Sequence, residues 1–193
     1  MALMLTVLVM SVGIVVHAPA SAHAQGDAAR TKSHSAQPSI VRGSGDLGLP
    51  APVVEMRQAM LEAVASGRIE DLRVAIELNE LKPMIGDHVA ADPIAALKAI
   101  SKDGEGRDIL AALGGILAAG WVAVPAGADV ENNRIYIWPH FVETGIGGLT
   151  GENRAEFDRV VPAEERASML AAGRYASWHL GIGADGTWHF LRR

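Results

Sequence analysis

The segment ASWHLGIGADGTWHF, residues 176–190, holds two tryptophans, two histidines and a phenylalanine around a Gly-Ala-Asp-Gly centre. Ala184 and Asp185 suit the central positions of a type I turn. Gly186 suits the left-handed conformation that follows such a turn in a three-residue hairpin loop. Apolar and polar side chains alternate in the two flanking runs, as they do in strands with one buried face. The segment therefore predicts a C-terminal β-hairpin.

The turn sets the register of this hairpin, and the register sorts its side chains onto two faces. The predicted core face carries Trp178, Leu180, Ile182, Trp188 and Phe190. The opposite face carries Ser177, His179, Gly181, Thr187 and His189. A shift of one residue would put tryptophans on both faces, which burial disfavours. The tryptophans and Phe190 are therefore expected in the core.

The region before residue 120 has a helical period. The first expected helix stops at Gly67 and buries the face formed by Val53, Met56, Met60, Ala63 and Val64. Its solvated face is formed by Glu55, Arg57, Gln58 and Glu62. A second helix is expected over residues 69–81. Asp92 and Pro93 suit the N-cap and first turn of a third helix, and residues 109–117 form a fourth amphipathic stretch.

The second half of the chain changes character, because all nine aromatic residues follow position 120. The runs WVAV (121–124) and RIYIW (134–138) predict short strands. Residues 152–160 and 162–173 predict two further helices. This order of elements favours an α+β fold, in which N-terminal helices pack on a small antiparallel sheet that contains the C-terminal hairpin.

The N-terminus predicts export. Residues 2–16 are apolar and uncharged, which is too short for a bilayer span of about 20 residues but suits the apolar core of a signal peptide. Ala22-His23-Ala24 supplies a small-x-small cleavage pattern. We therefore expect a signal peptide over residues 1–24, a flexible linker rich in Gly, Ser, Ala and Pro over 25–51, and one α+β domain over 52–193. The expected location is the periplasm or the medium, with no membrane span in the mature chain.

Composition and charge exclude several functional classes. The chain of 193 residues is 49% hydrophobic and 20% charged, as globular proteins are. Its 17 basic and 22 acidic residues give a net charge of −5, which disfavours nucleic acid and anionic membranes as partners. It has no cysteine, and therefore no disulfide, thiolate metal site or cysteine nucleophile. No phosphate-binding or nucleophile-elbow motif is present, so no cofactor is predicted.

Four side chains are candidates for catalysis: His140, Glu143, His179 and His189. The last two would be diagonal neighbours about 7–8 Å apart at Cα, close enough to share a metal ion or a proton. The alternative is that both lie on the solvated face of the sheet. His140-Phe141-Val142-Glu143 is an H-x-x-E pair, which zinc carboxypeptidases use with a more distant histidine, although it also suits a loop after a strand. Because no third ligand stands at a recognisable spacing, no metal is assigned.

The motifs RIYIWPHF and GIGADGTWHF, together with DPIAALK and GEGRDILAAL, resemble a family of short exported bacterial proteins of unknown function. The resemblance covers residues 53–193 and implies export and a shared fold, without a mechanism. It places an aromatic side chain at the position of His140, so His140 departs from the pattern.

Two functions remain open. The first is an exported, non-catalytic module that binds a protein or a component of the cell envelope. The second is a small periplasmic hydrolase, with or without a metal ion, that acts on a cell-wall or peptide substrate. In that case His140, Glu143, His179 and His189 would serve as ligands or as general acid and base.

Overall fold

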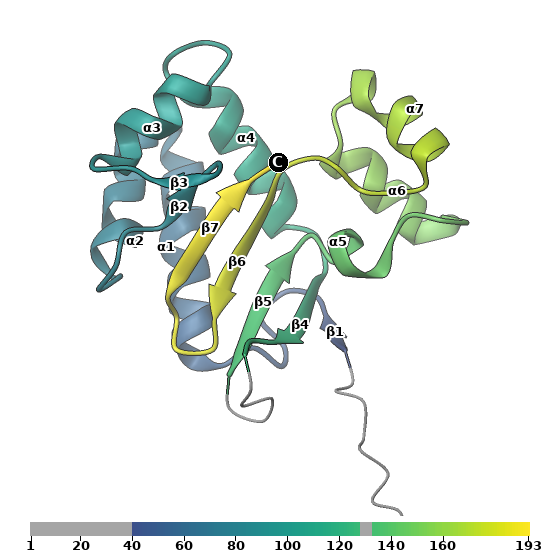
Figure 1. The fold of residues 1–193 in the computed structure, drawn as a ribbon, viewed down its shortest axis with the longest axis horizontal. Helices are drawn as coiled ribbons and strands as arrows, with labels where there is room; N and C mark the ends of the chain where they lie inside the picture. Colours follow the sequence, from purple (N-terminus) through teal and green to yellow (C-terminus); the bar gives the residue numbers. More distant parts are fainter. Residues whose placement is uncertain (1–39, 128–132) are drawn as a thin grey trace, which may run out of the picture. The chain divides into compact units, whose positions relative to one another are not determined.

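The C-terminal hairpin forms as the sequence predicts. A computed structural model describes residues 40–127 and 133–193. In it, β6 (His179–Gly183) and β7 (Trp188–Arg192) pair antiparallel, in yellow in Figure 1. Gly186 has a positive φ of 90°, and its N–H donates to the carbonyl oxygen of Gly183 at 2.9 Å. The expected turn around Ala184 and Asp185 is confirmed.

One residue on the hairpin lies on the face opposite to the expected one. Trp188 pairs with Ile182 but Phe190 pairs with Gly181, so His189 is an extra residue in β7. Such a bulge reverses the alternation beyond it. The ring of Phe190 therefore covers Gly181 on the other face, where a Cβ on Gly181 would lie 2.5 Å from it. Leu191 takes the place in the core that the sequence assigned to Phe190.

The remaining core positions of the hairpin agree with the expectation, with one exception. Leu180, Ile182 and Trp188 are completely buried. Trp178 precedes β6 and is only half-buried, packed against the edge of the core. The guanidinium of Arg193 lies 5.4 Å from the centre of its ring. Trp178 is therefore a boundary residue of the core.

The sheet has more strands than the sequence indicated. The expected runs form β4 (Trp121–Pro125) and β5 (Arg134–Trp138). Three short strands join them, namely β1 (Val41–Gly43), β2 (Met84–Ile85) and β3 (His88–Val89). The order is β1-β4-β5-β6-β7-β2-β3, and the pair β2·β7 is parallel (Figure 1). The α+β class is confirmed, with a mixed sheet of seven strands among the described residues.

Helices from the first half of the chain pack against this sheet in one apolar core. They are α1 (Ala51–Ser66), η1 (Ile69–Leu72), α2 (Arg73–Glu77), α3 (Pro93–Ile100) and α4 (Arg107–Leu117). Gly67 ends α1 in the left-handed conformation, and Asp92 caps α3 through the N–H groups of Ile94 and Ala95, as expected. The single helix expected over 69–81 is wrong. A 3₁₀ turn and a short helix occupy 69–77, and an irregular segment follows.

A second, smaller core lies among the helices that follow β5. They are α5 (Phe141–Thr144), α6 (Gly151–Val160) and α7 (Ala163–Ala172). Phe141, Phe157 and Met169 are buried there together with Ile146 and Val161. The sequence predicted α6 and α7 and left α5 as a loop.

The boundary of the expected linker needs correction. Residues 41–43 form β1, which pairs with β4, and the carboxylate of Asp46 forms an ion pair with Arg57 at 2.7 Å. Residue 51 is the first of α1. The folded region therefore includes at least part of the range that composition assigned to the linker. The expected signal peptide over 1–24 and the linker residues before 40 lie outside the described residues.

Within the ranges that the structure describes, no helix combines the length and apolar character that crossing a membrane requires.

Candidate functional site

His140 lies at the N-terminus of α5, with its side chain largely buried. Its Nδ1 is 2.9 Å from the hydroxyl of Thr144, one helical turn later. Its Nε2 is 3.6 Å from the carboxylate of Glu156 on α6. Burial lowers the pKa of His140, against the opposing effect of Glu156. The imidazole therefore joins α5 to α6.

The H-x-x-E pair does not come together as a pair of ligands. Glu143 is exposed, and the carboxylate facing His140 belongs to Glu156 instead. Glu156 also accepts the N–H of Gly120, which precedes β4, at 2.5 Å. Sequence spacing could not reveal this contact, because it joins α6 to residues in two other segments.

His179 uses both of its ring nitrogens in local hydrogen bonds. Its Nδ1 donates to the carbonyl oxygen of Ser177 at 3.1 Å. Its Nε2 accepts from Nε of Arg192 at 3.1 Å, which requires the neutral tautomer. Burial lowers the pKa of His179 and favours the same neutral form.

His189 is exposed at the bulge of β7, on the opposite face from Trp188. The diagonal pairing of His179 with His189 is absent, because the bulge places Arg192 opposite His179. The three histidines thus have different neighbours, although the negative charge of Glu143 lies close enough to His179 to oppose the lowering of its pKa. Among the described residues, no three His, Asp or Glu side chains gather in a way that could hold a metal ion.

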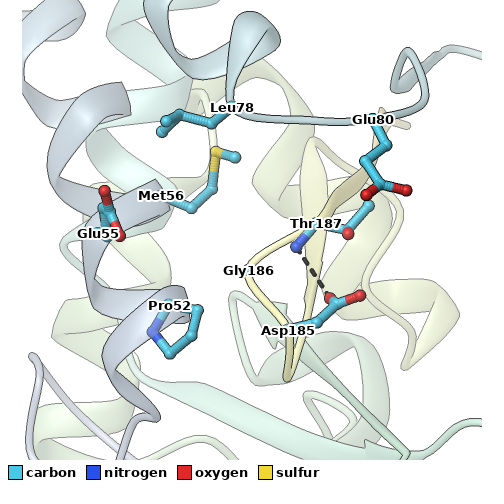
Figure 2. Close-up of a pocket in the computed structure, with 8 residues that line it drawn as sticks. All are labelled: Pro52, Glu55, Met56, Leu78, Glu80, Asp185, Gly186 and Thr187. Carbon is cyan, nitrogen blue, oxygen red and sulfur yellow. Dashed lines mark hydrogen bonds between the residues drawn. The ribbon is translucent and has the colours of Figure 1, made fainter.

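A cavity of about 330 Å³ lies where α1 faces the turn of the hairpin (Figure 2). Three structural elements supply its walls. The start of α1 contributes Pro52, Glu55 and Met56, the end of α2 and the segment after it contribute Leu78 and Glu80, and the hairpin turn contributes Asp185, Gly186 and Thr187. Its lining therefore combines apolar side chains with three carboxyl groups.

Two tertiary contacts hold these walls together. The side chain of Asn79 pairs with the backbone of Trp188 as a strand would, donating to its carbonyl oxygen and accepting its N–H, both at 2.9 Å. This fixes the neighbouring Glu80 beside β7. On the opposite wall, the turn lies against α1 so closely that a Cβ on Gly186 would be 2.9 Å from Pro52.

Glu55, Glu80 and Asp185 give the cavity an acidic lining. None of Glu55, Glu80 and Asp185 takes part in the ion pairs found in the described ranges. The N–H of Thr187 donates to Asp185 at 3.0 Å, and this hydrogen bond lowers the pKa of Asp185. The cavity therefore favours a cation.

The sequence pattern does not indicate this cavity. It placed Glu55 on a solvated helix face and Asp185 in a turn, and both placements are correct. Nothing in the spacing indicates that the two residues line one cavity. The contact that creates the site joins residues 109 positions apart, Asn79 and Trp188.

Comparison of the chain with protein-family models, with curated proteins and with solved structures found no match. The resemblance based on RIYIWPHF and GIGADGTWHF therefore stays a prediction.

Proposed function

We propose that this protein is an exported binding module that takes up a cationic group in the cavity between α1, the hairpin turn and Glu80. The observation that supports the proposal is a cavity lined by three carboxyl groups, none of which takes part in an ion pair found in the described ranges. A protein or a component of the cell envelope would present the cation, in the periplasm or the medium.

The lining suits an amine at the end of an apolar stem. The carboxylates of the lining lower the electrostatic energy of an ammonium or guanidinium group. Pro52, Met56 and Leu78 offer apolar surface to the methylene groups that carry such a cation. Lysine and arginine side chains have this combination. The periplasmic hydrolase stays a prediction with less support, because His140 faces Glu156, His179 bonds to Arg192 and His189 is exposed.

The test is calorimetric titration of the full chain with N-acetyl-lysine methylamide. We expect saturable binding that weakens as NaCl is raised, because salt screens partly exposed charges. The double variant Glu55→Gln, Glu80→Gln should bind at least about tenfold more weakly, a loss of about 1.4 kcal/mol. The matched control is Glu62→Gln, an exposed position on α1 outside the cavity. Equal affinity in the double variant would refute the proposal.

A further inference from the structure

The helices α5, α6 and α7 are inserted between two strands that pair with each other. Strand β5 ends at Trp138 and β6 begins at His179, and Trp138 lies opposite Leu180 in the sheet. The insertion therefore leaves and rejoins the sheet at neighbouring positions (Figure 1). Insertions with adjacent ends are tolerated as compact units of their own. We call these helices, residues 141–172, the α5–α7 unit.

The α5–α7 unit has internal contacts that do not depend on the sheet. Its apolar core includes Phe141 from α5, Phe157 from α6 and Met169 from α7. The rings of Phe141 and Phe157 meet edge to face, with their centres 5.9 Å apart. The guanidinium of Arg166 on α7 donates to the carbonyl oxygen of Val161, the residue after α6, at 2.8 Å. The three helices can therefore stay packed on one another when their contacts with the sheet are lost.

Two carboxylates join the α5–α7 unit to the rest of the protein. Glu156 on α6 accepts the N–H of Gly120 at 2.5 Å. Glu165 on α7 accepts the hydroxyl of Ser177 at 3.1 Å and forms an ion pair with Arg193 at the C-terminus. The side chains of Glu156 and Glu165 are 18% and 19% exposed. Hydrogen bonds to such largely buried carboxylates contribute more to stability than those between neutral groups.

Apolar side chains also meet at the boundary between the unit and the sheet. Val160 at the end of α6 is buried in the larger core, and Tyr175 after α7 packs against both cores. Separation of the unit from the sheet would expose part of this apolar surface to water, which costs free energy. The closed form therefore predominates, and an open form is a minor state.

We infer that the α5–α7 unit opens from the sheet as one body, and that Glu156 and Glu165 hold it closed. The inference goes beyond the proposed function, because the acidic cavity lies elsewhere, between α1, the hairpin turn and Glu80. In the closed form His140 and Ser177, at the two ends of the unit, are 9% and 1% exposed. Opening brings this imidazole and this hydroxyl into contact with water. The protein thus has a second conformation that presents groups which the closed form hides.

Hydrogen–deuterium exchange of the full chain, read by mass spectrometry, tests the inference. The protected amides of α5, α6 and α7 should share one opening free energy and exchange faster than those of β5 and β6. In the double variant Glu156→Gln, Glu165→Gln, exchange in residues 141–172 should become at least about tenfold faster, while exchange in β5 and β6 stays the same. If this variant does not fold, Arg193→Gln removes one partner of Glu165 from an exposed position and should accelerate the same amides by a smaller factor.

The matched control is Glu164→Gln. Glu164 also links α7 to a residue outside the unit, Lys102 at 3.6 Å, but these two side chains are 66% and 70% exposed. Its loss should change exchange by less than about threefold, since exposed ion pairs contribute little. Exchange in residues 141–172 as slow as in β5 and β6, or equal acceleration of the unit and the sheet, would overturn the inference. Unchanged exchange in both the double variant and Arg193→Gln, or an equally large effect of Glu164→Gln, would overturn it as well.

Discussion

Trp188 and His189 are neighbours in the chain with opposite environments. The indole of Trp188 is completely buried, and its Nε1–H donates to the carbonyl oxygen of Phe190 at 3.0 Å. Its backbone N–H and carbonyl oxygen both pair with the side chain of Asn79. The imidazole of His189 is exposed at the bulge. Of the aromatic side chains in residues 176–190, Trp188 is therefore the one that lies fully in the core.

This difference predicts the stability of two variants. Trp188→Ala should lower the free energy of unfolding by about 3–5 kcal/mol, because it empties a large buried volume. His189→Ala should change it by less than about 0.5 kcal/mol, because an exposed side chain loses little on truncation. Urea denaturation midpoints of the two proteins measure both values. A silent Trp188→Ala would mean that the hairpin does not contribute its indole to the core.

Arg57 shows how a single residue can escape prediction from sequence. Its helical spacing puts it on the polar face of α1, yet it is largely buried. One guanidinium nitrogen donates to Asp46 at 2.7 Å, and another to the carbonyl oxygen of Leu117 at 2.8 Å. Periodicity describes a side chain relative to its own helix, and these partners come from two other segments.

At the scale of elements, the contact between α1 and α4 depends on a glycine. A Cβ on Gly114 would lie 2.9 Å from Cγ1 of Val64, whereas the nearest atom to a Cβ on Gly115 is 3.9 Å away. In the sequence, these are two adjacent glycines within a helix, where each lowers helix stability relative to alanine. The sequence pattern does not distinguish their roles. The packing does tell them apart, because only Gly114 stands at the helix crossing.

The two glycines therefore predict different responses to alanine. Gly115→Ala should raise the free energy of unfolding by about 0.5–1 kcal/mol, because alanine restricts the unfolded chain and meets only ordinary contacts. Gly114→Ala should not show this stabilisation, because the added methyl group would crowd Val64, and overpacking of a core costs about 1–3 kcal/mol of stability. Thermal melts of both variants check the order. Equal stabilisation would show that α1 and α4 can separate at no cost.

The helix expected after Gly67 is shorter than its apolar pattern predicts, because a tertiary contact replaces its last turn. The apolar pattern of residues 69–81 predicts one helix, but the helix ends at Glu77. Asn79 then pairs with β7 in the manner of a strand. A continuous helix would hold Asn79 in a different backbone arrangement, and the backbone of Trp188 would lose both bonds. The same interruption places Glu80 in the candidate cavity.

At the scale of the whole molecule, one buried and one half-buried imidazole predict how stability depends on pH. Burial lowers the pKa of His140 and that of His179 from the ordinary value of 6.5. The unfolded chain therefore binds these protons at higher pH than the folded protein does. Their contribution to stability is complete above pH 6.5 and is lost as pH falls through the two lowered pKa values.

The urea concentration at the unfolding midpoint should therefore decrease as the pH is lowered from about 7.5 to below 6.5. Replacing both histidines by asparagine should flatten this dependence. Asp103, Asp108 and Asp185 also have lowered pKa values, but their ordinary value of 3.8 puts their effect at lower pH. A midpoint that stays constant over the histidine range would contradict the burial of the two imidazoles.

The sequence alone determined the α+β class, the strands at 121–124 and 134–138, and the hairpin with its turn at Gly186. These features depend on local periodicity and on backbone conformations that neighbouring residues specify. Tertiary structure decided the positions of β1, β2 and β3, the bulge that turns Phe190 away from the core, and the partner of His140. It also decided the cavity, because Glu55, Glu80 and Asp185 meet only after α1, the segment beyond α2 and the hairpin pack together. Contacts between segments distant in sequence leave no periodic trace, so only the packed fold brings these carboxylates to one place.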